Sequence, residues 1–316
     1  MKGLELAERY YFEVCAPMLQ KKFPDWMKRM AAGLVGDGSE CYGYDDELSR
    51  DHDWGAEMCL WLTDEDYAAF GSEVAAEVSK LPQSFLGYPV SHISSWGHGR
   101  RGVLTIGSFY RKFLGTAAAP TTLAEWRRIP EHHLAAAANG RVFADYLGAF
   151  SAVRHILIHD YYPEDIRKKK LAARCMTAAQ AGQYNYSRIV ARGEWVAAHL
   201  ATAEFLAAAG SITYLLNKRY APFYKWMHRG LQELPVQGKA VAELMDRLVK
   251  EKMPSSKEAN CQCGSEIIEE ICALLITELR RQGLSDSTSS FLLDHGLFIH
   301  NTIENTELRN TNPWAE

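Results

Sequence analysis

The sequence predicts an α+β protein in which a small mixed sheet comes first and an α-helical bundle follows. Three observations lead to this prediction. Short apolar runs alternate with amphipathic segments over the first 115 residues, as in a sheet packed against helices. From Thr121 onward, apolar residues recur at helical spacing and no further strand is expected. Apolar residues make up 47% of the 316 residues, which is enough to fill two cores.

The first region should begin with a helix over residues 3–30, which Pro17 and Pro24 kink or divide. Thr63, followed three residues later by Asp66, is a start signal for a helix that runs to about residue 80. Strands, or in the first case a strand or helix end, are expected at residues 30–35, 58–62, 90–95 and 103–106. The turn between the last two contains His98, Arg100 and Arg101.

The second region should be helical throughout. Thr122 and Glu125 form another start signal, and Gly182 is expected to end the helix that opens at Pro163. The expected helices cover residues 131–139, 150–159, 164–181, 186–216, 221–234, 240–251 and 266–281. We therefore expect three parts, namely a domain over 1–120, a helical domain over 121–284 and a weakly structured tail over 285–316 with a short helix near 291–300.

The motif that organises the chain is the stretch 36–55, which reads GDGSECYGYDDELSRDHDWG. Asp51 and Asp53 stand at positions i and i+2, so on an extended segment both carboxylates would point the same way. Such a pair can hold Mg²⁺, which prefers oxygen ligands. Gly38 and Ser39 can form a backbone cradle for phosphate groups, because glycine allows close approach and exposed N–H groups bind anions.

These residues resemble the motif of the DNA polymerase beta-like nucleotidyltransferase superfamily. Its usual pattern is Gly-Ser, three residues, Gly, five residues and Ser-Asp-x-Asp. This chain has Gly38-Ser39, then Gly43 and Ser49, but Arg50 is inserted before Asp51. The phrases GQYNYSR and LLNKRYAPFYKWMHR also resemble an uncharacterised bacterial family that joins such a head to a helical domain. The resemblance implies a nucleotidyltransferase head, a transferase activity that is ATP-binding and magnesium-dependent, and no established acceptor.

Some members of that superfamily use a third metal-site carboxylate from a later strand, but residues 78–124 contain no Asp or Glu. Either two carboxylates suffice or another segment supplies the third. If a general base is used, the helical region must provide it, and we choose Glu194 from four candidates. The others are Glu131, Asp145 and Glu164; a salt bridge with Arg188 or Arg192 is the structural alternative for Glu194.

Charge is distributed unevenly along the chain. Residues 1–125 carry 12 Lys and Arg against 18 Asp and Glu, whereas residues 161–229 carry 11 against four. An acidic metal-holding head and a basic helical segment suit a Mg–nucleotide between them. Lys218 and Lys225 are the cations we expect to bind the triphosphate, with simple packing as the alternative for their aromatic neighbours.

The predicted reaction is transfer of a nucleoside monophosphate, AMP from ATP, to a hydroxyl of a small molecule or a protein. The alternative is a catalytically inactive nucleotide-binding or interaction module, in which Arg50 and the missing third acid mark a dead site. The sequence shows no strongly basic face for duplex nucleic acid and no apolar run of 18 residues for a membrane. Seven irregularly spaced cysteines suggest reduced thiols, so we expect a cytoplasmic location.

Overall fold

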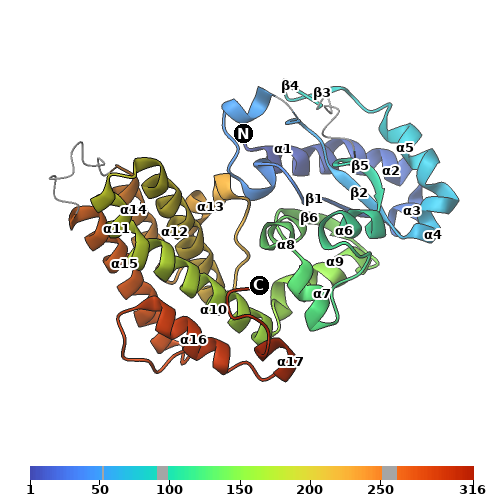
Figure 1. The fold of residues 1–316 in the computed structure, drawn as a ribbon. Coiled ribbons are helices and arrows are strands. Elements are labelled where there is room, and N and C mark those ends of the chain that lie inside the picture. Colours follow the sequence, from blue (N-terminus) through green and yellow to red (C-terminus); the bar gives the residue numbers. More distant parts are fainter. Residues whose placement is uncertain (52, 91–98, 251–261) are drawn as a thin grey trace. The chain divides into compact units, whose positions relative to one another are not determined.

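The computed structural model describes residues 1–316 except 52, 91–98 and 251–261, and the side chains of residues 51, 262 and 263 are also left out. The chain is an α+β protein, as the sequence predicts (Figure 1). It divides into two compact units, Met1–Tyr161 and Tyr162–Glu316.

The first unit contains a four-stranded sheet in the order β5-β2-β1-β6. β1 runs antiparallel to both β2 and β6, whereas β5 runs parallel to β2. The strands are β1 (Ala31–Leu34), β2 (Cys59–Leu62), β5 (Gly102–Thr105) and β6 (Arg141–Asp145). The strands expected at 30–35, 58–62 and 103–106 are thus confirmed. A small hairpin, β3 (Ser84–Phe85) with β4 (Tyr88–Pro89), precedes the expected strand at 90–95, which lies outside the described residues from 91 on.

The assignment of helices alone after Thr121 is wrong, because β6 lies there. β6 forms along the free edge of β1, with Ala31 opposite Asp145 and Leu34 opposite Arg141. In the described sheet the backbone of β6 pairs with β1, which lies far away along the chain. The five residues of β6 therefore carry too little local pattern to predict the strand. The segment before Tyr161 therefore completes the sheet, and the compact units divide there instead of at residue 120.

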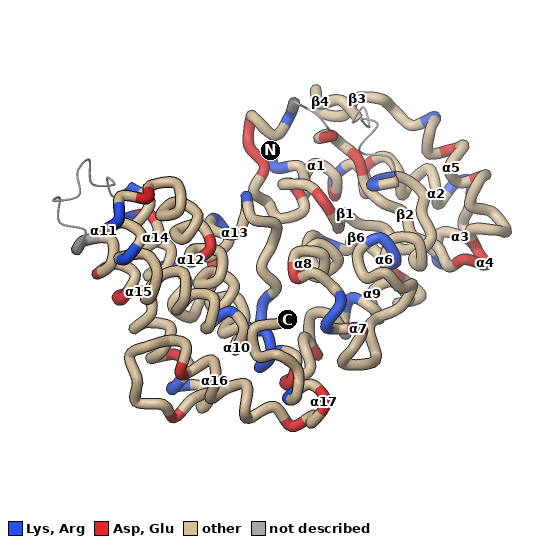
Figure 2. Tube along the Cα trace, in the orientation of Figure 1, with Lys and Arg blue, Asp and Glu red and all other residues tan. Residues whose placement is uncertain are grey.

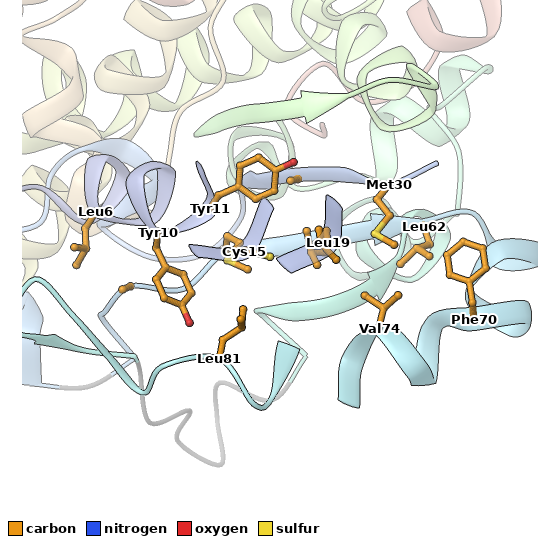
Figure 3. Close-up of a cluster of buried hydrophobic side chains, with 14 of the residues drawn as sticks. Leu6, Tyr10, Tyr11, Cys15, Leu19, Met30, Leu62, Phe70, Val74 and Leu81 are labelled. Carbon is orange, nitrogen blue, oxygen red and sulfur yellow. The ribbon is translucent and has the colours of Figure 1, made fainter. Parts of the chain in front are cut away.

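Successive side chains of β2 point to opposite faces of the sheet, and each face packs against different helices. Leu60 and Leu62 belong to a buried cluster with residues of the first helices and of α5 (Figure 3). Trp61 points to the other face, where its ring stacks on Phe150 with the ring centroids 3.9 Å apart. The helices of this unit are α1 (Gly3–Tyr10), α2 (Ala16–Lys22), α3 (Pro24–Met27), α4 (Asp64–Asp66), α5 (Ser72–Val78), α6 (Ile106–Leu114), α7 (Leu123–Arg128), α8 (Glu131–Ala138) and α9 (Ala149–His155).

Local start and stop signals account for several of these helix ends. The Thr63 side chain accepts a hydrogen bond from the Asp66 N–H, and Thr122 forms a capping box with Glu125. Both predicted helix starts are confirmed. Pro24 does divide the first helix, since Phe23 leaves the helical conformation with φ −136° and ψ 51°. Pro17 lies inside α2 directly after a π-helical turn, and the helix continues through it.

The second unit is helical over its described residues. Its helices are α10 (Glu164–Ala178), α11 (Ser187–Arg192), α12 (Trp195–Leu216), α13 (Tyr224–Leu231), α14 (Gly238–Lys250), α15 (Gln262–Arg281), α16 (Leu292–Asn301) and α17 (Thr306–Arg309). Residues 285–316 differ from the expected weak structure, because Ile299 and Ile303 are fully buried and α16 packs on α10.

Gly182 does not end a helix, contrary to the prediction. A π-helical segment, Ala179–Tyr186, carries the chain from α10 into α11, and the break comes at Gly193, whose φ is 74°. A Cβ on Gly182 would lie 2.4 Å from Cδ2 of Phe205. This glycine is therefore explained by close packing of two helices and not by a turn.

We expect Gly182→Ala to destabilise the protein by about 1–3 kcal/mol, because the new methyl group overpacks the contact with Phe205. The direction of the change in stability distinguishes a crowded from an uncrowded site, because glycine to alanine in an uncrowded helix would stabilise the protein by up to about 1 kcal/mol. Urea unfolding of the variant measures the change, with the exposed Ser187→Ala as the control. An increase in stability for Gly182→Ala would show that the helices separate easily at this point.

Among the described residues, one helix, α12, is long and apolar enough to cross a membrane by length and composition alone. Half of its apolar window is buried inside the protein. Ala198, Phe205 and Ile212, for example, have no exposed surface. That burial is typical of the central helix of a bundle, so the length and composition of α12 are weak evidence for a span.

Candidate functional site

The glycine turn of the motif follows β1 directly. Gly36 and Gly38 have φ values of 121° and 122°, which side-chain-bearing residues rarely adopt. The side chain of Asn139 holds Gly36 through two hydrogen bonds, donating to its carbonyl at 2.8 Å and accepting from its N–H at 2.9 Å. A Cβ on Gly38 would lie 2.3 Å from Oε1 of Glu40. Glycine is required at this point by both conformation and space.

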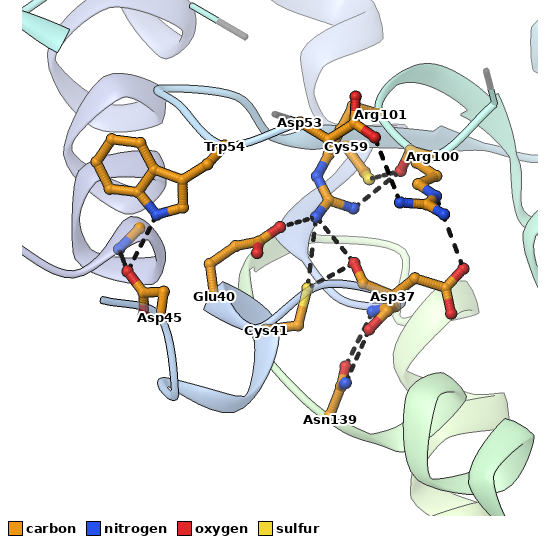
Figure 4. Close-up of polar contacts among 12 residues, drawn as sticks. Asp37, Glu40, Cys41, Asp45, Asp53, Trp54, Cys59, Arg100, Arg101 and Asn139 are labelled. Carbon is orange, nitrogen blue, oxygen red and sulfur yellow. Dashed lines mark hydrogen bonds and ion pairs between the residues drawn. The ribbon is translucent and has the colours of Figure 1, made fainter. Parts of the chain in front are cut away.

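A buried ion pair lies beneath this turn (Figure 4). Nη2 of Arg101 donates to Glu40 at 2.5 Å and to the Asp37 carbonyl at 3.1 Å, and Sγ of Cys41 lies 3.5 Å away. The side chains of Arg101 and Glu40 are each only 8% exposed. Arg101 precedes β5, so this pair ties the start of one strand to the turn after another.

A second set of charges lies around Arg100, the residue before. Its Nη1 is 3.5 Å from Oδ2 of Asp53, and its Nε is 4.0 Å from Oδ2 of Asp37. Nζ of Lys112, on α6, donates to the same Asp37 oxygen at 2.6 Å. Arg100 thus lies close to both Asp37, the residue before Gly38, and Asp53, the second acid of the motif (Figure 4).

The segment that carries the paired acids is not extended, which differs from the prediction. Asp51 ends a short 3-10 turn, Leu48–Asp51, and Asp53 has a left-handed φ of 51°. Trp54 is buried directly after it, and β2 begins six residues after Asp53. The side chain of Asp51 is outside the described part of the structure, so its partnership with Asp53 stays a prediction.

The inserted Arg50 has a structural explanation. Its guanidinium lies over the rings of Trp54 and Tyr88, at 5.0 and 5.5 Å from their centroids. Asp45 fixes the same loop from the other side, since its Oδ2 accepts from Nε1 of Trp54 at 3.0 Å and from the Gly3 N–H at 2.7 Å. The insertion is therefore accommodated by packing of the loop on β4 and α1.

Glu57 is a site residue that the sequence analysis missed. Burial raises the pKa of its carboxyl to about 7; the charge of Arg101 lowers it, and the negative charges of Asp53 and Glu40 raise it further. A carboxyl that titrates near neutral pH can exchange a proton with a reacting group. The sequence analysis also missed the ion pair between Glu40 and Arg101. Two adjacent arginines in a stretch without acids could have indicated that they pair with acidic residues from another part of the chain.

The raised pKa of Glu57 predicts how the stability of the protein changes with pH. The folded protein keeps this proton up to about pH 7, whereas an unfolded chain releases it near pH 4.5. The unfolding free energy should therefore decrease as pH rises between these values. Glu57→Gln should be more stable than the wild type at pH 8, by roughly 1–2 kcal/mol after allowance for solvent screening, and equal to it below pH 4.5.

Urea unfolding at pH 4.5 and pH 8 in the presence of EDTA measures this difference, and Glu47→Gln, an exposed acid of the same loop, is the control. Equal stability of wild type and Glu57→Gln at both pH values would contradict the raised pKa of Glu57 and the burial that mainly causes it.

The other predicted site residues lie in the second unit. Glu194 is exposed and stands just before α12, after the break at Gly193, and not inside one long helix. Lys218 is exposed with a left-handed φ of 51°. Lys225 is exposed and lies over the ring of Trp226, 5.1 Å from its centroid. Their participation in the site of the first unit stays a prediction.

No group of three or more His, Cys, Asp or Glu with the arrangement of a metal site is found among the described side chains, which do not include that of Asp51. Oxygen donors of the kind that a hard cation binds lie near Arg100, where Asp37 is paired with Arg100 and Lys112 and Asp53 is paired with Arg100. Asp37 and Asp53 offer carboxylate oxygens, and Glu57 is destabilised in its charged form by burial and by its acidic neighbours. A divalent cation would relieve that repulsion.

Comparison with known proteins gives a similarity over part of the chain and no activity. A family model described as "Domain of unknown function (DUF4037)" matches residues 126–227, or 102 of the 316 residues. No curated protein and no solved structure matches the chain. Over that segment, which includes α8, β6 and α10–α12, the chain is similar to this family.

Proposed function

We propose that the protein is a Mg²⁺-dependent nucleotidyltransferase that transfers a nucleoside monophosphate, AMP from ATP, to a hydroxyl group. The observation that carries the proposal is the position of Arg100. Its guanidinium reaches Asp53 at 3.5 Å and Asp37 at 4.0 Å, and Asp37 directly precedes Gly38. The two halves of the nucleotidyltransferase-like motif therefore meet at one point of the first unit.

The glycine turn supplies the phosphate side of the site. Gly36 and Gly38 hold the backbone in a left-handed conformation, which Asn139 and Arg101 keep in place through hydrogen bonds to Gly36 and to the Asp37 carbonyl. A preformed cradle binds phosphate without the entropic cost of ordering a loop. In this proposal Gly38 and Ser39 bind the β- and γ-phosphates, and Lys218 and Lys225 of the second unit are the predicted further cations.

Asp51 and Asp53 would hold the Mg²⁺, which when bound polarises the α-phosphate and offsets the charge that develops on it. The acceptor oxygen forms a bond to the α-phosphorus, and the bond from that phosphorus to the bridging oxygen breaks. Pyrophosphate leaves with the electron pair, and the hydroxyl proton passes to a carboxylate. Glu194 is the predicted base, and Glu57 is a second candidate because its pKa lies near 7.

The acceptor is a small molecule or a protein with a free hydroxyl. Duplex nucleic acid is not proposed, because the chain carries a net charge of −4 and no strongly basic face. The described cysteines that are free, Cys15, Cys41, Cys59, Cys175 and Cys272, are all buried thiols, which fits the proposed cytoplasmic location.

A thermal-shift titration with Mg²⁺ and each of the four NTPs tests nucleotide binding. A ligand at 100 times its dissociation constant should stabilise the protein by about 2.7 kcal/mol. Pyrophosphate release with candidate acceptors then tests catalysis. Binding without release under any condition would favour the inactive nucleotide-binding alternative, in which Arg50 and the missing third acid mark a dead site. Absence of any shift with all four nucleotides would overturn the proposal.

A further inference from the structure

The helix α10 carries buried cations, which is unusual for a helix in a bundle. Arg167, Lys169 and Lys170 are 3%, 1% and 5% exposed. Figure 2 marks these Lys and Arg residues along the tube. Removing a charged group from water costs several kcal/mol unless good partners replace the water, and apolar residues of similar volume often serve packing better. The partners of these cations therefore indicate what they are for.

Arg167 has a structural role. Its Nε donates to the Leu215 carbonyl at 3.0 Å and its Nη2 donates to Oε1 of Gln282 at 2.6 Å, so it joins α10 to α12 and to α15. Its Nη1 also pairs with Glu164 at 3.1 Å. Three well-placed acceptors from three elements account for its burial.

Lys168 donates to the Thr302 carbonyl at 2.9 Å, whereas the three cations further along the helix contact one segment, Asn312–Glu316. Nζ of Lys169 donates to the Asn312 carbonyl at 2.6 Å. Nζ of Lys170 lies 3.5 Å from Oε2 of Glu316. Arg174, one turn further on, contacts both oxygens of the same carboxylate, with Nε 2.5 Å from Oε1 and Nη2 2.9 Å from Oε2. This segment lies after α17, and Asn312 and Trp314 within it are exposed.

The geometry around Glu316 is that of an anion-binding site. Nη2 of Arg174 donates to one carboxylate oxygen, Nε lies close to the other oxygen without a hydrogen bond to it, and the Lys170 ammonium lies beside them. Cations gathered around one anionic group in this way are how proteins bind carboxylates and phosphates. Here two cations, Lys170 and Arg174, share the side-chain carboxylate of Glu316, and Lys170 also lies 5.5 Å from the centroid of the Tyr162 ring. A phosphate group has a similar spacing of oxygens and carries up to two negative charges, so it can pair with both cations more completely than one carboxylate does. Burial and the nearby charge of Lys169 also lower the pKa of His300, which shows that the surroundings disfavour further positive charge.

We propose that Lys170 and Arg174 form a binding site for a phosphate group, and that the segment Asn312–Glu316 covers this site with the Glu316 carboxylate in the place of the phosphate. The ligand is a phosphate-bearing anion, either free pyrophosphate or the phosphates of a nucleotide. Release of the exposed segment would open the site. This inference concerns the second unit alone and does not depend on the proposed nucleotidyltransferase activity.

Calorimetric titration of the full chain with inorganic pyrophosphate tests the site. We expect Glu316→Gln to bind at least roughly tenfold more tightly than the wild type, because the competing carboxylate is removed and the competent state becomes more populated. Adding Arg174→Gln to that variant should abolish the gain, and Arg174→Lys should restore part of it. Arg174 is suitable because its side chain is 32% exposed, which lowers the risk of misfolding. Arg247→Gln, an exposed arginine paired with Glu270, is the matched control.

The same titration with ATP, made in the Asp53→Asn background, distinguishes the two sources of phosphate. Binding of ATP that depends on Arg174 would assign a nucleotide, and binding of pyrophosphate alone would assign a free phosphate. The proposal would be overturned if the wild type and Glu316→Gln bound pyrophosphate with the same affinity and replacing Arg174 did not change that affinity. Glu316 would then serve only to hold the segment Asn312–Glu316 against α10. Because Asp53 is already replaced, failure here says nothing of the nucleotide site in the first unit.

Discussion

Asp53→Asn is expected to lower the rate of pyrophosphate release from a Mg–NTP on the order of 10²- to 10³-fold, the size of effect seen when one electrostatic contact to the reacting centre is lost. The amide has the shape of the carboxylate but no charge with which to hold a divalent cation. The substitution should leave the backbone undisturbed, since Asp53 has a left-handed φ of 51° and asparagine adopts that region readily. A change in melting temperature without nucleotide should therefore come mainly from the lost ion pair with Arg100 and the weaker repulsion of Glu57, and it should be small because these two effects oppose each other.

The measurement is pyrophosphate release by the wild type and the variant, each with and without Mg²⁺. Asp25→Asn is the control, because Asp25 is an exposed acid on α3 outside the motif. Unchanged release by a folded Asp53→Asn variant would falsify the assignment of the metal to this residue. The thermal shift with Mg–NTP should also be lost in Asp53→Asn and kept in Asp25→Asn.

Arg101→Met should destabilise the first unit by about 3–5 kcal/mol, the usual cost of removing one partner of a buried ion pair. Methionine fills similar space but leaves the Glu40 carboxylate, only 8% exposed, without its cation. The Asp37 carbonyl would lose a donor as well. The glycine turn above the pair should then lose its fixed conformation, so any nucleotide response should weaken together with stability.

Hydrogen exchange of β1, β2 and β5 reports the stability of the first unit separately from that of the second. Adding Glu40→Gln to Arg101→Met should recover most of the loss, because no buried charge remains. Arg100→Met, the adjacent residue, is the matched control and should cost less than about 1 kcal/mol, since its side chain is 32% exposed. A large loss that Glu40→Gln fails to relieve would mean that Arg101 acts through its other contacts.

Much of the local structure could be read from the sequence. The caps at Thr63 and Thr122 and the strands β1, β2 and β5 depend on neighbouring residues and on the pattern within each segment, so short-range rules were sufficient. Gly38 was also informative, because a glycine in this motif indicates a backbone that side-chain-bearing residues rarely adopt or that a ligand approaches closely.

Other features depend on partners far away along the chain. β6 exists because β1 offers it an edge more than 100 residues earlier, and Arg101 is buried because Glu40 lies beneath the same turn. Gly182 looks like a helix stop in the sequence, but the ring of Phe205 explains it. Asp53 was expected on an extended segment, but it has a left-handed conformation beside the buried Trp54.

The sequence by itself therefore determined the α+β class, most helices and the candidate nucleotide motif, because each of these is encoded within a few consecutive residues. Only the tertiary structure decided which charges meet, namely Arg100 with Asp37 and Asp53, Arg101 with Glu40, and Arg174 with Glu316. The physical reason is that an ion pair and a raised pKa depend on burial and on distances of a few ångströms. Those quantities are set when the whole chain packs, and no local pattern contains them.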